Sequence, residues 1–189
     1  MELREFIDRE GRCVIPECVK EIEEGAFEEC TGLTSVDIPD GVTWIDWRSF
    51  CHCTGLRSVR IPSHVTFIWK LAFADCVALS SVEIPEGVTE ICDGAFYGCQ
   101  NLSSVHIPGS VTEIGKYAFE NCSGLLSVEI PAGVVKVGER TFSGCKALSS
   151  VEFPDGLTKI GLDAFKGCPG VKDSDVPDCG REEFSDLPF

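Results

Sequence analysis

The twelve cysteines are the residues of this 189-residue chain best suited to chemistry, as metal ligands, disulfide partners or nucleophiles. Seven of them recur every 23 residues: Cys30, Cys53, Cys76, Cys99, Cys122, Cys145 and Cys168. Thiols that recur at a fixed period lie along a line, so four of them cannot coordinate one metal ion. An odd number of equivalent thiols also cannot all be paired in disulfides. We therefore expect small buried thiols, with no metal and no other cofactor.

His52 lies between Cys51 and Cys53, which is a second arrangement that could hold a metal ion. Cys53 belongs to the periodic set and is expected to point inward, away from His52. This orientation argues against a shared metal.

Nucleophilic catalysis by serine is not supported. One serine also repeats with the 23-residue period, but none of its copies has a nearby base with an orienting acid. The copies are Ser35, Ser58, Ser81, Ser104, Ser127 and Ser150. Only three histidines occur, and no phosphate-binding glycine loop is present. The sequence predicts no catalytic residues and no enzyme.

The elements that position these residues follow from the same period. Prolines keep it at Pro16, Pro39, Pro62, Pro85, Pro108, Pro131, Pro154 and Pro177. The consensus is L-x-S-V-x-I-P-x-x-V-T-x-I-x-x-x-A-F-x-x-C-x-x, and a period shared by two unrelated residue types indicates a structural repeat. S-V-x-I-P alternates like a half-buried strand that ends at proline. V-T-x-I predicts a second short strand, and A-F-x-x-C predicts one turn of α- or 3₁₀-helix.

One repeat cannot bury its apolar residues alone, whereas stacked repeats bury them against identical neighbours. We call each repeat a rung. The phenylalanines of successive rungs are expected to form a continuous spine. They are Phe27, Phe50, Phe73, Phe96, Phe119, Phe142 and Phe165.

The consensus resembles the BspA-like, treponemal-type leucine-rich repeats, whose 23-residue unit carries the same I-P, V-T-x-I, A-F and C landmarks. The resemblance runs from about Cys13 to Pro177. It implies a right-handed leucine-rich repeat solenoid of about seven rungs with capped ends. A parallel β-sheet would cover one face, and short second strands and helical or 3₁₀ turns the other. It also implies protein recognition, and many relatives are surface or secreted proteins associated with adhesion.

Three segments are predicted. Residues 1–12 form an N-terminal helical cap, because Leu3, Phe6 and Ile7 follow helical spacing. Residues 13–172 form the solenoid, and residues 173–189 form a C-terminal cap with an acidic tail.

The net charge limits the kinds of partner that the chain is expected to bind. With 31 acidic and 16 basic side chains, the net charge is 16 − 31 = −15, which disfavours nucleic acids and anionic membranes. No apolar run predicts membrane insertion. The first ten residues lack the apolar core of a signal peptide, so the chain as it stands would be cytoplasmic. The resemblance favours the cell surface or secretion if an export signal was removed, and the compartment stays open.

Aromatic residues interrupt the repeat at one place. The third residue of V-T-x-I is charged at Glu21, Glu90, Glu113, Lys136 and Lys159, but adjacent rungs carry Trp44 and Phe67 there. Trp47 and Trp69 follow the same segments. Exposed aromatic residues are typical of interaction sites, so these four form the preferred partner-binding site. The alternative is that the rings pack on each other or under a loop.

A second candidate surface is the column between the strand valine and isoleucine. Its members are Asp37, Arg60, Glu83, His106, Glu129 and Glu152. Opposite charges on neighbouring strands stabilise one another, as in the first three, whereas Glu129 and Glu152 repel. The column is either a solvated sheet face or an acidic partner surface.

These patterns predict a non-enzymatic module that binds a protein partner. One alternative is a self-associating structural protein in which the aromatic residues form a homodimer seam. A carbohydrate-binding surface, with tryptophans as stacking platforms, is a third hypothesis.

Overall fold

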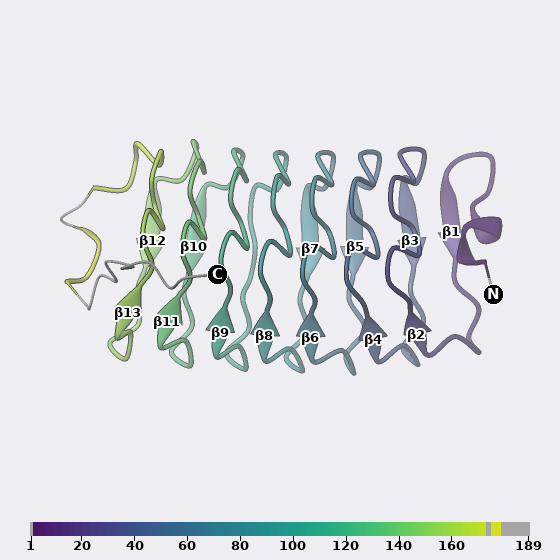
Figure 1. The fold of residues 1–189 in the computed structure, drawn as a ribbon, viewed down its shortest axis with the longest axis horizontal. Coiled ribbons are helices and arrows are strands. Elements are labelled where there is room, and N and C mark those ends of the chain that lie inside the picture. The colour runs from purple at the N-terminus through teal and green to yellow at the C-terminus, as the bar shows by residue number, and fades with distance from the viewer. Residues whose placement is uncertain (1, 173–174, 179–189) are drawn as a thin grey trace, which may run out of the picture.

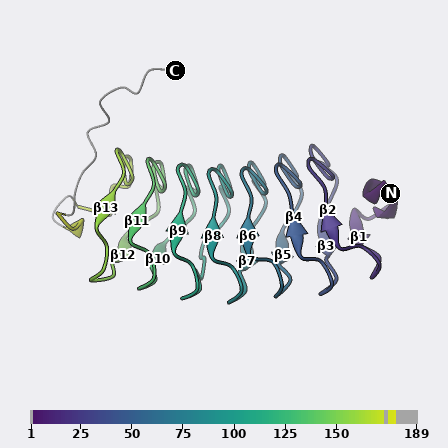
Figure 2. The ribbon, with the colours of Figure 1, turned by 60° about the horizontal axis from the view of Figure 1, so that its bottom comes forward.

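The computed structural model describes residues 2–172 and 175–178. The chain winds into a rod of stacked rungs, starting at one end and advancing one rung at a time (Figure 1). Two rows of short parallel strands run along the rod (Figure 2). The predicted leucine-rich repeat solenoid is confirmed.

The first row contains the S-V-x strands. They are β1 (Arg12–Val14), β3 (Ser35–Asp37), β5 (Ser58–Arg60), β7 (Ser81–Glu83), β10 (Ser127–Glu129) and β12 (Ser150–Glu152). The second row contains the T-x-I strands. They are β2 (Glu21–Ile22), β4 (Trp44–Ile45), β6 (Phe67–Ile68), β8 (Glu90–Ile91), β9 (Glu113–Ile114), β11 (Lys136–Val137) and β13 (Lys159–Ile160).

Residues that pair between neighbouring strands are one sequence repeat apart. Val59 pairs with Val82 in the first row, and Ile91 pairs with Ile114 in the second row. Each residue therefore lies beside its equivalent in the next rung. This register is why a column read from the sequence becomes a column on the surface or in the core.

The phenylalanine spine fills the interior. Successive rings from Phe27 to Phe165 lie 5.0–5.5 Å apart between centroids, in stacked geometry. The rings from Phe27 to Phe142 are fully buried, whereas Phe165 near the end is half-buried. The side chains thus leave no open interior between the two rows of strands.

The periodic cysteines lie beside the spine as free thiols. Six of the seven are buried, and Cys30 in the first rung is half-buried. Burial is the main reason that the pKa of the Cys53 thiol and that of the Cys122 thiol are each raised to about 12. Both thiols are therefore protonated at neutral pH.

The A-F-x-x-C segments differ from the predicted helical turn. They consist of consecutive tight turns. Their backbone N–H groups donate alternately to a carbonyl of the same rung and to a carbonyl of the next rung. The N–H of Cys99 donates within its rung to the carbonyl of Phe96 at 3.3 Å, whereas the N–H of Phe96 donates to Ala118 of the next rung at 2.8 Å. Gly94 and Gly98 adopt positive φ there, a conformation outside the right-handed helix. The segment does not form a helix, because about half of its backbone N–H groups donate to carbonyls of the next rung instead of to carbonyls within the segment.

The pairing is parallel, as predicted, but within the described residues neither row forms one unbroken sheet. In the first row β1 pairs with β3, β5 with β7, and β10 with β12, while residues 103–107 pass between β7 and β10 without forming a strand. The second row contains the longer ladder, in the order β13-β11-β9-β8-β6, and β2-β4 is separate from it. The second row is therefore broken between β4 and β6.

The N-terminal segment contains a 3₁₀-helix of four residues, η1 (Leu3–Phe6), where the sequence predicted a longer amphipathic helix. Leu3 is buried, but Phe6 is 37% exposed. The side chain of Arg4 donates hydrogen bonds to the carbonyls of Ala26 and Gly25 at 2.9 and 3.0 Å, which fixes the segment to the first rung.

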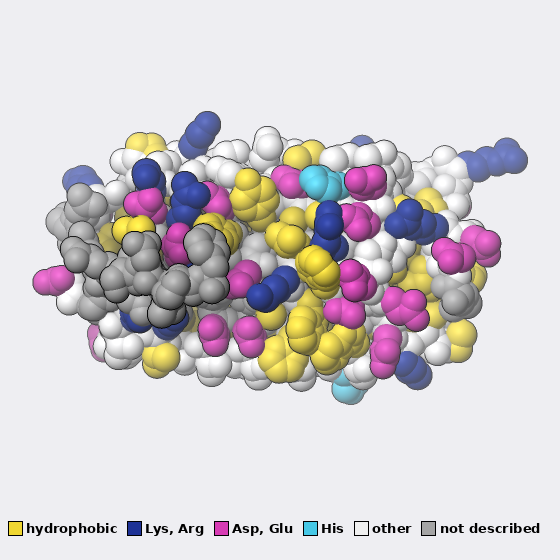
Figure 3. Space-filling model, viewed as in Figure 1, with side chains coloured by type: hydrophobic (Ala, Val, Ile, Leu, Met, Phe, Trp, Pro, Cys, Tyr) yellow, Lys and Arg dark blue, Asp and Glu magenta, His cyan; other side chains and the backbone are white. Residues whose placement is uncertain are grey.

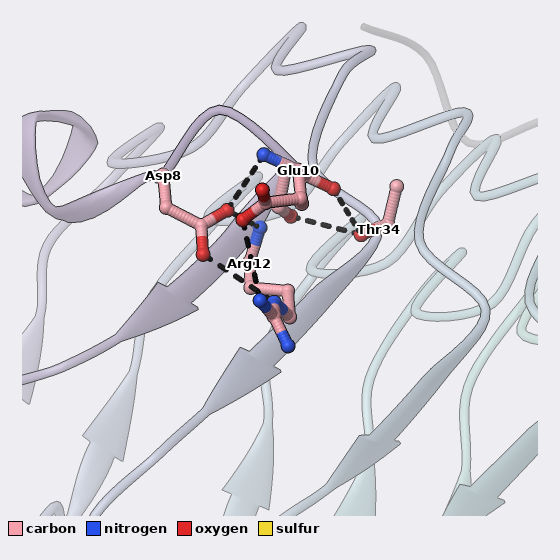
Figure 4. A network of polar contacts seen from close by, with 5 residues as sticks. Asp8, Glu10, Arg12 and Thr34 are labelled. Atoms are coloured by element: carbon pink, nitrogen blue, oxygen red, sulfur yellow. Dashed lines mark hydrogen bonds and ion pairs between the residues drawn. The ribbon is translucent and has the colours of Figure 1, made fainter.

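A polar network closes the loop that precedes β1 (Figure 4). One carboxylate oxygen of Asp8 accepts hydrogen bonds from the backbone N–H groups of Glu10 and Arg12, at 2.9 and 2.8 Å. The hydroxyl of Thr34 in the next rung donates to the carbonyl of Glu10 at 3.1 Å. The loop is thereby tied both to itself and to the second rung. Of the predicted C-terminal segment, residues 173–174 and 179–189 lie outside the described residues.

Candidate functional site

Three of the four predicted aromatic residues form one cluster, which we call the aromatic cluster: Trp44, Phe67 and Trp69. The ring of Trp69 lies 4.8 Å from that of Trp44 and 6.0 Å from that of Phe67, between centroids. We predicted that Trp44 and Phe67 would lie side by side, and the structure places the Trp69 ring in contact with both. Hydrophobic side chains gather over β4 and β6 on this face of the rod (Figure 3).

The aromatic cluster is partly accessible to solvent. Trp44 is 36% exposed, and Phe67 and Trp69 are half-buried. The indole Nε1 of Trp69 is enclosed and has no hydrogen-bond partner. An enclosed, unpaired donor of this kind costs roughly 1–3 kcal/mol of stability. The rings therefore pack on each other and still present a surface, which combines the two interpretations left open by the sequence.

The aromatic cluster lies over the break in the second row of strands. Among the described residues, no backbone hydrogen bond joins β4 to β6. The same two rungs remain connected at the tight turns, where Phe50 N–H donates to the carbonyl of Ala72 at 2.8 Å. The rungs at this edge are therefore bridged by aromatic side chains where their neighbours are bridged by backbone hydrogen bonds.

Carboxylates flank the aromatic cluster along the rod. Glu21 is in register with Trp44 on one side, and Glu90 is in register with Phe67 on the other. Glu113 follows Glu90 in the next rung. Figure 3 shows acidic side chains on both sides of the hydrophobic patch. The surface therefore combines an apolar centre with negatively charged flanks.

Trp47, the fourth predicted aromatic residue, is 42% exposed and lies apart from the cluster. Its ring faces the guanidinium of Arg48 at 5.9 Å, and no ring contact within the described part of the chain joins it to the other three. Trp47 instead lines a groove over the tight turns of neighbouring rungs.

The groove, of about 490 Å³, was not predicted from the sequence. Its small, buried residues include Cys51, Ala74 and Gly94, and Tyr97 and Tyr117 also line it. Two side-chain contacts border it: His52 Nδ1 lies 3.7 Å from a carboxylate oxygen of Asp75, and Lys70 forms an ion pair with Asp93 at 3.3 Å. The sequence carried little signal for it, because among its small residues only Cys51 and Ala74 share a repeat position, whereas Gly94 is equivalent to Leu71.

The second candidate surface, which we call the strand-face column, is exposed along its length. It consists of Asp37, Arg60, Glu83, His106, Glu129 and Glu152. Its two basic residues each lie close to an acidic residue that is not part of the column. Arg60 Nη2 lies 2.9 Å from a carboxylate oxygen of Asp40, and His106 Nε2 lies 3.9 Å from one of Glu86. Both acids follow the proline of the preceding rung. The hydrogen bond to Asp40 is the main cause that raises the pKa of Arg60 above its ordinary value.

The remaining column members keep the expected register where strands exist. Arg60 lies opposite Glu83, and Glu129 lies opposite Glu152 as a pair of like charges. Asp37 is on β3, and His106 lies in the stretch that forms no strand. The column is therefore not one continuous ladder of interacting charges.

Within the described residues, no three metal-ligating side chains come together, and His52 pairs with Asp75 while Cys53 is buried. In the same part of the chain, no helix has the length and apolar character needed to cross a bilayer.

Comparisons with known proteins agree with this geometry. The family described as the BspA type leucine rich repeat region matches residues 11–126 and 66–186, in six copies. The chain is similar to the leucine-rich repeat protein of T. pallidum, with 30% identity and a TM-score of 0.82 over 87% of this chain and 79% of that one. It is also similar to a leucine rich cell surface protein of Faecalibacterium prausnitzii, with 28% identity and a TM-score of 0.59 over 85% of this chain and 65% of that one. No curated protein sequence matches significantly. The repeat, the solenoid and these matches together show that the chain belongs to the BspA-type leucine-rich repeat family.

Proposed function

We propose that the chain is a non-enzymatic module that recognises a protein partner through the aromatic cluster. The observation that carries the proposal is the presence of Trp44, Phe67 and Trp69 on a face where equivalent rungs carry charged or small residues. Tryptophan is enriched among the residues that contribute most to binding at protein interfaces. A rigid solenoid also holds such side chains in place, so little conformational entropy is lost on binding.

The similarity to a leucine rich cell surface protein supports a role at a cell surface. We extend this proposal to adhesion, the role that the resemblance of the repeat implies. The strand-face column, with its exposed acids, is the second candidate surface for the same function. A carbohydrate ligand in place of a protein remains an outcome of the test.

The test compares partner capture by the wild-type chain, a Trp44→Ser/Phe67→Ser variant and a Leu126→Ser/Val135→Ser control. The control removes two apolar side chains that are 56% and 52% exposed and lie outside both candidate surfaces. We expect a specific protein to bind the wild type and the control and to be lost from the aromatic variant, with unchanged circular dichroism. Equal capture by all three proteins would contradict the proposal, as would binding of glycans alone.

A further inference from the structure

We propose that the aromatic cluster binds a segment rich in arginine or lysine on the partner. This inference rests on the proposed function and adds the chemistry of the partner to it. It follows from the order of side chains along the second row: acid at Glu21, aromatic residues at Trp44 and Phe67, and acids again at Glu90 and Glu113.

The flanking carboxylates are available to an incoming cation. Glu21 and Glu113 are exposed, and in the described part of the chain the carboxylate of neither has a hydrogen-bond or ion-pair partner. Glu90 is half-buried and accepts only a weak hydrogen bond, from the thiol of Cys92 at 3.3 Å. Glu23 and Glu24 of the first rung are exposed as well. Binding a cation here replaces no existing salt bridge.

The aromatic rings suit the same partner. A guanidinium stacks on tryptophan more favourably than on other aromatic side chains, and it binds carboxylates through paired hydrogen bonds. Parallel strands lie about 4.8 Å apart, so a ring and the carboxylate in register with it can contact one cationic side chain. Glu21 beside Trp44 and Glu90 beside Phe67 supply two such pairs.

The charge order disfavours a second copy of this chain as the partner. A symmetric dimer presents the same patch from both subunits, related by a two-fold axis. With the axis between β4 and β6, the rung of Glu21 faces the rung of Glu90, so carboxylates oppose carboxylates. Like charges placed together at an interface oppose association.

The charge order also sets the extent of the site. The column changes sign at Lys136, which is in register with Glu113. A cationic segment is therefore attracted to the rungs of β2 to β9 and repelled from β11 onward. This asymmetry would fix the position of the segment along the rod.

The test uses a blocked tetra-arginine peptide as the probe and tryptophan fluorescence as the readout. It compares the wild type, a Glu21→Gln/Glu90→Gln variant and a Glu17→Gln/Asp155→Asn control that changes the net charge equally. Both control positions are exposed turn residues that follow the repeat proline. We expect the peptide affinity to fall about tenfold in the first variant and less than about twofold in the control. Equal losses in both, or equal binding of a tetra-glutamate peptide, would overturn the inference.

The partner captured by the wild type separates this inference from the proposed function. If that partner is lost from Trp44→Ser/Phe67→Ser but bound normally by Glu21→Gln/Glu90→Gln, recognition through the aromatic cluster stands and the cationic segment is wrong. If it is bound normally by both variants, the proposed function itself fails.

Discussion

The thiol sulfur of Cys99 lies 3.2 Å from the carbonyl oxygen of Phe73, one rung earlier in the rod. The same contact repeats at 3.0–3.2 Å in five other rungs: Cys53 with Phe27, Cys76 with Phe50, Cys122 with Phe96, Cys145 with Phe119, and Cys168 with Phe142. Cysteine is small and apolar and carries a weak donor, so it fills the space beside the spine and donates to a buried carbonyl. The periodic cysteines therefore connect successive rungs without forming disulfides.

This packing predicts a sharp contrast in thiol reactivity. The thiolate is the reactive form, so buried thiols with a raised pKa react slowly while the protein is folded. We expect iodoacetamide at pH about 8 to modify the exposed Cys18 quickly and Cys99 only after unfolding. Peptide mass spectrometry measures both rates. Modification of Cys99 as fast as Cys18 in the folded protein would show that the interior is open.

The buried thiols also predict a loss of stability at alkaline pH. The pKa of Cys122 is raised by burial from an ordinary 9.0 to about 12, so the folded state keeps a proton that the unfolded state releases. This contribution is complete below pH 9.0 and is lost as the pH rises toward about 12. Between pH about 8 and about 10.5, Cys122 alone should lower the free energy of unfolding by about 2 kcal/mol.

Urea unfolding at the two pH values measures this effect. A Cys122→Ser variant should lose less stability between them than the wild type, since serine does not titrate in that range. The same decline in both proteins would assign the alkaline loss to other groups.

The phenylalanine spine predicts a dependence on position. Phe96 has stacked rings on both sides, at 5.5 and 5.3 Å. Phe96→Ala should therefore cost about 3–5 kcal/mol of unfolding free energy. Phe165→Ala should cost less, because its ring is half-buried and, among the described residues, only Phe142 stacks on it in parallel. Chemical denaturation compares the two, and equal losses would contradict a rod stabilised by nearest-neighbour contacts.

The break between β4 and β6 predicts fast amide exchange under the aromatic cluster. Thr89 and Cys92 donate to the carbonyls of Thr66 and Ile68, each at 2.8–2.9 Å. The equivalent amides one rung earlier, Thr66 and Trp69, have no such acceptor in the described structure. Hydrogen exchange should therefore be faster at Thr66 and Trp69 than at Thr89 and Cys92. Equal protection at the four amides would mean that the ladder is continuous.

The sequence predicted most of the core because the core is periodic. Phe96, Cys99 and their equivalents occupy fixed positions in each rung, and the strand register keeps them in columns. The tight turns were predicted wrongly as helical. Many of their N–H groups donate to carbonyls of the next rung, as Phe96 N–H does to the carbonyl of Ala118. A pattern within one short segment of sequence does not reveal an acceptor that lies one rung away.

The candidate site was predictable in composition but not in arrangement. Trp44 and Phe67 stand out because they interrupt a charged column. The contacts of Trp69 with both rings depend on side-chain packing between rungs, which spacing alone does not fix. The groove depends on small residues from three rungs meeting at one surface, and the contacts of His52 with Asp75 and of Lys70 with Asp93 depend on side-chain conformations.

The most direct test of recognition through the aromatic cluster is the affinity of the captured partner for the wild type and for Trp44→Ser/Phe67→Ser, measured by surface plasmon resonance. Losing two central aromatic contacts should weaken binding by about 30-fold or more, which corresponds to about 2 kcal/mol. The Leu126→Ser/Val135→Ser control should bind like the wild type. An affinity of the aromatic variant within about twofold of the wild type would contradict the account, because a hot spot cannot be removed at so small a cost.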